Sequence, residues 1–181
     1  MTRVCLITSA ATLGCLIASA AGEEPDLKAA ITKLSVALEK NDKEAANKLI
    51  DELKKEDLEY VMELMKPPKS NKQAFDFTKE GIELKLTLMV KKPRDMNANA
   101  ETYEKMANVL TAIAEYTKFK CPIEKPVGAK DPKDWAKWSA DMKEGAKALG
   151  AAARAKDPKK VSIAAKKITG ACVSCHEVFG P

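Results

Sequence analysis

The chain of 181 residues contains one histidine, no internal repeat and no long block of consecutive basic residues. The absence of a repeat excludes a solenoid. Because the 31 lysines and arginines are distributed along the whole chain, we expect a solvated basic surface and no nucleic-acid groove. No acid and base pair marks a substrate pocket, so the sequence does not predict an enzyme.

One short motif near the end of the chain carries most of the chemical information. Cys172, Cys175 and His176 form the pattern C-x-x-C-H, which is typical of covalent attachment of a c-type haem. Residues three apart lie on one face of a helix, so both thiols can reach neighbouring vinyl groups of one macrocycle. His176 follows Cys172 by about one turn, where its imidazole can bind iron as the proximal ligand. The sequence therefore predicts one covalently attached haem c.

Two other interpretations of this motif are weaker. A structural zinc site needs four ligands, usually as two Cys/His pairs, and outside the motif and the first twenty residues only Cys121 supplies a further thiol. A thioredoxin-like C-x-x-C requires a βαβ setting and a thiolate at a helix N-terminus. Here the motif falls at the far end of an expected helix.

The first twenty residues have the pattern of a secretory signal peptide. Arg3 provides the positive start, Val4–Ala18 the apolar stretch, and Ala18–Ala20 the small residues of a cleavage site. The apolar stretch is too short and wrongly flanked for a membrane span. Cys15 faintly resembles a lipoprotein processing site, but Thr12 stands where leucine is expected, so we do not favour a lipid anchor. The pattern predicts export to the periplasm.

Export affects both the charge and the remaining thiol. Removal of residues 1–20 takes away Arg3 and no acidic residue, so the formal net charge falls from +5 to +4. A basic surface of this kind can steer an acidic redox partner. Cys121 is left as a single thiol in an oxidising compartment. It either forms an intermolecular disulfide or is a buried, inert thiol, and we favour the second.

The N-terminal part predicts a helical hairpin over residues 21–66. Apolar residues recur at helical spacing over residues 26–40, and Asn41 with Glu44 has the pattern of a capping box before a second helix. That helix either runs on to residue 66 or restarts near Asp57, because Met62 would otherwise lie on the opposite face from Leu53.

Residues 67–181 predict a helical bundle that carries the motif. Residues 69–81 have the composition of a loop, and residues 82–90 alternate like a strand but lack a pairing partner, so a short buried helix is preferred. A helix is expected over residues 100–119, and two more begin at Asp131-Pro132 and Asp157-Pro158. The apolar stripes of the last two helices are Trp135, Trp138, Met142 and Leu149, then Val161, Ala165, Ile168, Cys172, Cys175 and Phe179. The chain is predicted to be all-α.

From about residue 97 to residue 179 the sequence resembles the class II cytochromes c, the cytochrome c′ and c-556 type. The resemblance rests on C-x-x-C-H near the end of the last helix, on Phe179 three residues after His176, and on the preceding Asp-Pro helix with its tryptophan. It implies a four-helix bundle of cytochrome c′ type, here with an extra N-terminal helical hairpin. Gly180 and Pro181 stand where the family often has a basic residue, and the hairpin has no counterpart in the minimal family fold.

The resemblance also implies two candidates for a sixth iron ligand. The c-556 branch uses a methionine in a Val-Met context, which Val61 and Met62 resemble, and Met65 is a nearby substitute. Histidine is excluded because the chain has no second one. The plainer interpretation is that both methionines pack in the core. Trp135 and Trp138 are interpreted in the same way, as core anchors.

The sequence thus predicts a periplasmic single-electron carrier with His/Met ligation and unidentified redox partner proteins. The alternative is a five-coordinate haem protein that binds small gases such as NO or CO for sensing or scavenging. A third possibility is a haem-free helical interaction module. A homodimer is possible in each case.

Overall fold

The computed structural model describes residues 26–93 and 95–180, and the expected signal peptide over residues 1–20 lies outside these ranges. Within them the chain is helical, and the sole β-type pairing is an isolated bridge between Val127 and Lys130. The helices are α1 (Leu27–Glu39), α2 (Lys43–Leu53), α3 (Leu58–Glu63), α4 (Ile82–Lys91), α5 (Met96–Thr117), α6 (Pro132–Arg154) and α7 (Pro158–Phe179). The predicted all-α class is confirmed.

Aspartate caps most of the helix starts. Its carboxylate accepts a backbone N–H of the first turn, which would otherwise lack a partner. The caps predicted at Asp131 and Asp157 are confirmed, and each precedes a proline at the first helical position. The other aspartate caps are Asp26, Asp42, Asp57 and Asp95. Short local signals therefore fix where these helices begin.

The predicted capping box at Asn41 is wrong by one residue. Asp42, not Asn41, caps α2, and its carboxylate accepts the Ala45 N–H at 3.0 Å. Asn41 has φ +56°, a left-handed conformation that asparagine tolerates better than most residues. It therefore forms the tight turn between α1 and α2, and the next residue is free to cap.

The ambiguous segments in the middle of the chain are resolved as short helices. α2 ends at Leu53 and a new helix begins after Asp57, so the restart is confirmed and the continuous helix to residue 66 is wrong. Residues 82–91 form α4, which confirms the short buried helix and excludes a strand there. Its core-facing residues include Ile82, Leu86 and Met89, which recur at helical spacing.

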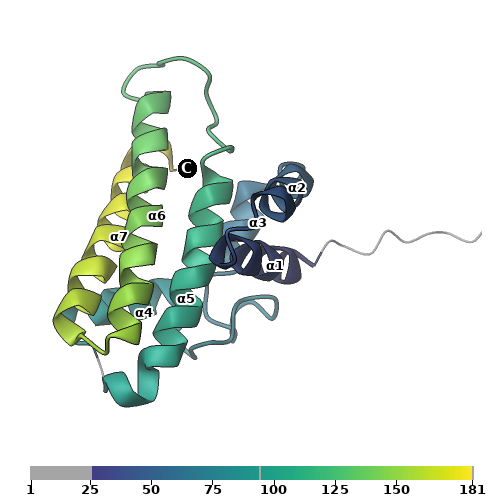
Figure 1. Cartoon of the computed structure of the whole chain (residues 1–181). Coiled ribbons are helices and arrows are strands. Elements are labelled where there is room, and N and C mark those ends of the chain that lie inside the picture. Colours follow the sequence, from purple (N-terminus) through teal and green to yellow (C-terminus); the bar gives the residue numbers. More distant parts are fainter. Residues whose placement is uncertain (1–25, 94, 181) are drawn as a thin grey trace, which may run out of the picture.

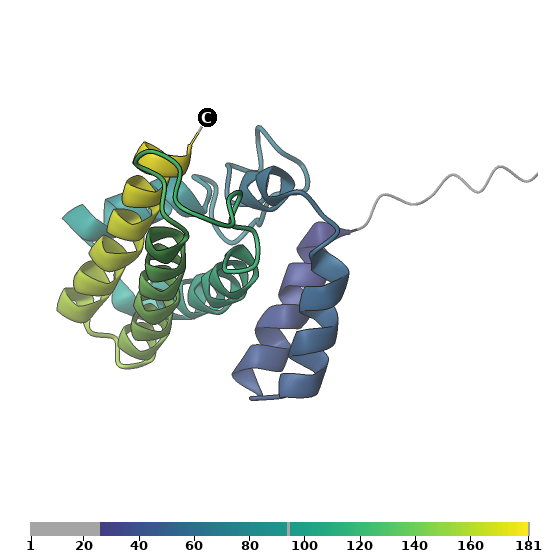
Figure 2. The ribbon, with the colours of Figure 1, turned by 90° about the horizontal axis from the view of Figure 1, so that it is seen from above.

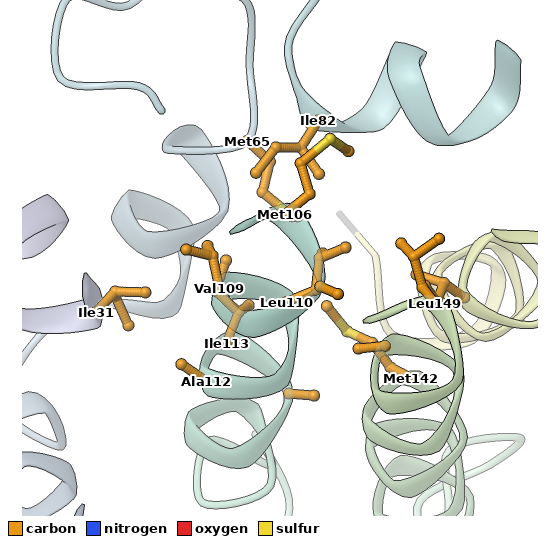
Figure 3. Packing of buried hydrophobic residues seen from close by; sticks show 14 of the residues in the cluster. Ile31, Met65, Ile82, Met106, Val109, Leu110, Ala112, Ile113, Met142 and Leu149 are labelled. Atoms are coloured by element: carbon orange, nitrogen blue, oxygen red, sulfur yellow. The ribbon is translucent and has the colours of Figure 1, made fainter. Parts of the chain in front are cut away.

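The helices form a bundle around one core. α5 packs against α6, α6 against α7, and α4 against α7, while α1 packs against both α2 and α5. Figures 1 and 2 show α5 between the α1–α2 hairpin on one side and α6 on the other. Figure 3 shows the core, in which Leu110 of α5 faces Met142 and Leu149 of α6. The buried apolar cluster is continuous from Leu27 to Ala171.

Candidate haem attachment site

The last turns of α7 hold all three residues of the C-x-x-C-H motif. Val161, Ala165 and Ile168 are fully buried, as their stripe predicts. Further along the same stripe, Cys172 and Cys175 are partly buried, and His176 is exposed. The final turn of α7 therefore leaves the core gradually, so the imidazole is accessible while Cys172 still packs against core residues. Both cysteines are free thiols.

The direction of the histidine follows from helix geometry. Ser162, Thr169 and His176 are seven residues apart, which is almost two helical turns, so the three share one stripe of α7. The Ser162 hydroxyl donates to the carbonyl of Val90, at the C-terminal end of α4, at 2.8 Å. Ser162 therefore lies against the C-terminal end of α4, and His176 follows on the same stripe near the opposite end of α7.

The N-terminal end of α4 lies near the motif. Glu83, in its first turn, is close enough to Cys172 to disfavour the thiolate electrostatically. The same carboxylate raises the pKa of Lys66, although the hydrogen bond from Lys66 to Glu63 is the largest cause. Sequence analysis missed Glu83, because an acidic residue in the first turn of a helix is common and carries no further signal.

The segment with the candidate methionines meets the same end of α4. The backbone N–H of Ile82 donates to the carbonyl of Met65 at 2.8 Å. Figure 3 shows the Met65 side chain in the part of the core that holds Ile82 and Met106, and Met65 is 5% exposed. Met62 is half-buried. Both methionines therefore lie in a segment that borders α4, and α4 borders the motif.

The glycine before α4 makes this junction possible. Gly81 has φ +78°, and a Cβ there would lie 2.6 Å from the Pro67 nitrogen and 2.7 Å from the Lys66 carbonyl carbon. A left-handed φ and a close backbone contact both favour glycine. The Gly81 position thus fixes the start of α4 against residues 66 and 67.

Burial dominates the electrostatics of the two motif thiols. It raises the pKa of Cys172 to about 11, with smaller contributions from the neighbouring Cys175 and from Glu83. Burial also raises the pKa of Cys175, and the Cys121 thiol adds to this shift. Both thiols are therefore held protonated at neutral pH, so they are poor nucleophiles until they are deprotonated.

An aromatic cluster closes the end of the bundle beside the motif. The ring of Phe179 packs edge-on against Trp135, with centroids 5.1 Å apart, and against Trp138 at 6.0 Å. The Trp135 indole donates to the carbonyl of Thr117, at the end of α5, at 2.8 Å. Trp135 is buried in the core, whereas Trp138 is half-buried at its edge. The cluster joins the ends of α5, α6 and α7.

The residues present fit a covalently attached haem. Two free thiols and an accessible imidazole follow one another on a single helix, which is the donor set that c-type attachment requires. One turn before Cys172, the buried hydroxyl oxygen of Thr169 has no hydrogen-bond partner. Buried polar atoms of this kind indicate a water or ligand that would complete them. Among residues 26–93 and 95–180, no group of three or more Cys, His, Asp or Glu is arranged to hold a metal ion by itself.

Comparison of the chain with models of protein families, with curated proteins and with solved structures found no match. No helix in the described part of the chain is long and apolar enough to cross a membrane. A function is therefore inferred from the motif and from the geometry around it.

Proposed function

We propose that this protein is a periplasmic c-type cytochrome that carries single electrons. Cys172 and Cys175 would hold one haem through thioether bonds, and His176 would bind its iron. When bound, the haem supplies a one-electron iron couple. The chain's own contribution would be to hold the group on the last turns of α7, next to the N-terminal end of α4, and to present a surface to a redox partner.

The observation that carries the proposal is the geometry of the last turns of α7. The two thiols are free, they lie on one face of an uninterrupted helix, and the single imidazole of the chain follows directly in sequence and is exposed. The Thr169 hydroxyl without a partner adds a polar group beside the same surface. The N-terminal pattern of a secretory signal peptide supports the proposed export to the periplasm.

The sixth iron ligand distinguishes two candidate functions, because a methionine ligand suits electron transfer and an open position suits gas binding. Met62 is the better candidate for ligation, because it is half-buried and so can turn outward at little cost. Met65 is 5% exposed and lies with Ile82 and Met106 in the core, so its release would leave a cavity. Because Met65 is held in the core, Met62 is the single remaining methionine that could bind the iron. This narrower choice also supports the second candidate function, a five-coordinate haem protein that binds small gases.

Haem attachment is tested on the exported protein. We expect the mass of the purified chain to exceed that of the processed polypeptide by one haem, and a pyridine haemochrome spectrum to show thioether-linked haem. Cys172→Ser and Cys175→Ser should each lose most of the attached haem. Cys121→Ser, which changes a thiol outside the motif, is the matched control and should retain it. Absence of haem from the wild-type chain purified from the periplasm would refute the proposal.

Low-temperature EPR of the ferric protein separates the two functions. Methionine ligation predicts a low-spin spectrum that becomes high-spin in Met62→Leu. Leucine keeps most of the side-chain volume but lacks the sulfur, so the fold should be retained. Met65→Leu is the matched control and should leave the spectrum low-spin. High-spin iron in the wild type would exclude the His/Met carrier and support gas binding.

A further inference from the structure

A third free thiol lies beside the motif, and it comes from a different part of the chain. Cys121 is in the loop between α5 and α6, is partly buried, and donates to the carbonyl of Ile123 at 3.1 Å. Figures 1 and 2 show this loop passing beside the C-terminal end of α7. Neither the motif nor the proposed function assigns Cys121 a role.

Contacts of Trp135 bring the loop that carries Cys121 toward the end of α7 that carries Cys175. The Trp135 indole N–H donates a hydrogen bond to the Thr117 carbonyl, and the same indole packs against the ring of Phe179. Cys121 follows Thr117 by four residues, and Cys175 precedes Phe179 by one helical turn. These contacts and the path of the loop therefore bring Cys121 to the end of the bundle that carries the second cysteine of the motif.

Cys175 is a better partner for the loop thiol than Cys172. Cys172 lies one turn deeper in α7, where it packs against core residues and near Glu83. Cys175 is nearer the end of the helix, beside which the loop passes. A loop can adjust its backbone to reach disulfide geometry more readily than a packed helix can.

We propose that Cys121 and Cys175 form an intramolecular disulfide in the haem-free chain. With a small disulfide such as oxidised glutathione as the oxidant, the Cys121 thiolate attacks one sulfur and releases one glutathione thiol. The Cys175 thiolate then attacks the Cys121 sulfur of the mixed disulfide and releases the second glutathione. Two protein thiols are oxidised, one glutathione disulfide is reduced to two thiols, and each protein proton goes to a departing glutathione thiolate.

The disulfide has a consequence that rests on the proposed function. The Cys175 sulfur can bond either to haem or to Cys121, so the two modifications exclude each other. An oxidised Cys121–Cys175 pair would block haem attachment until a dithiol reductant restores the thiols. The loop cysteine would then make attachment sensitive to the redox state of the compartment.

The link itself is tested on the full haem-free chain, so its failure is separate from failure of haem attachment. The reduced chain is treated with oxidised glutathione at pH 8 under native conditions and in urea, then alkylated, digested and mapped by mass spectrometry. In urea we expect mainly the Cys172–Cys175 link, because those residues are close in sequence. Under native conditions we expect the Cys121–Cys175 peptide pair to exceed the Cys172–Cys175 pair at least fivefold.

Three variants make the result specific. Cys172→Ser should form the Cys121–Cys175 link at a rate within about twofold of the wild type, because that thiol takes no part. Cys121→Ser and Cys175→Ser should each lose the link. The proposal is overturned if the native and urea maps are alike, if only mixed disulfides with glutathione appear, or if the native chain forms mainly Cys172–Cys175.

Discussion

The substitution Gly81→Ala tests the junction that holds α4 next to the motif. Gly81 has φ +78° and ψ 165°, a region that residues with a Cβ enter at a cost of about 1–3 kcal/mol. The added methyl would also lie within 2.9 Å of three backbone atoms of residues 66 and 67, which must then shift. Overpacking of this kind costs about 1–3 kcal/mol. We expect the free energy of unfolding to fall by about 2–6 kcal/mol.

Variants of two other glycines separate the two causes of the expected loss of stability, which are backbone strain and overpacking. Gly128 has φ +60° with no atom within 4 Å of the position of a Cβ, so Gly128→Ala isolates the backbone strain at about 1–2 kcal/mol. Gly170 has open space and an ordinary helical φ, so Gly170→Ala should raise stability by about 0.5–1 kcal/mol.

Equilibrium urea unfolding of the three variants and the wild type, compared at equal m-values, measures the differences. We expect Gly81→Ala to be the least stable of the four proteins and Gly170→Ala the most stable. If Gly81→Ala loses no more than Gly128→Ala, the contact of α4 with residues 66 and 67 is not part of the stable fold. The placement of Met62 and Met65 near the motif, which depends on this contact, would then also be refuted.

Three further predictions concern the rest of the fold. Trp135→Phe should lower the free energy of unfolding by about 1–2 kcal/mol more than Trp138→Phe, because only the first removes a buried indole hydrogen bond; equal losses would contradict this. Asp42→Ala should lower the free energy of unfolding, measured in urea, by about 1 kcal/mol, because it removes the cap of α2. Asn41→Gly should change it by less than about 0.5 kcal/mol, because glycine accepts the same positive φ. The reverse order would indicate that Asn41 is the cap. Burial raises the pKa of Tyr116 to about 12, so the folded state favours the protonated phenol and loses this stabilisation as the pH rises from 10 to about 12. Tyr116→Phe should lack this part of the alkaline loss in pH-dependent unfolding, and an identical pH profile would refute it.

Prediction from the sequence worked best where the signal is local. The Asp-Pro pairs placed the starts of α6 and α7 correctly, because a cap and its proline act within one turn. The same reasoning misplaced the cap of α2 by one residue, because both Asn41 and Asp42 suit a cap and only the backbone shows which has the positive φ. The alternating pattern of residues 82–90 could not distinguish a strand from a helix until the absence of a pairing strand was considered.

The sequence by itself determined the all-α class, most helix boundaries and the three motif residues on α7. All of these depend on the order of neighbouring residues, through capping, apolar spacing and the C-x-x-C-H pattern. The tertiary structure alone decided that α4 packs against α7, that Met65 lies in the core, and that the loop carrying Cys121 passes beside the C-terminal end of α7. These features join residues far apart in the chain, and they depend on how the apolar faces of whole helices fit together, which local patterns do not encode.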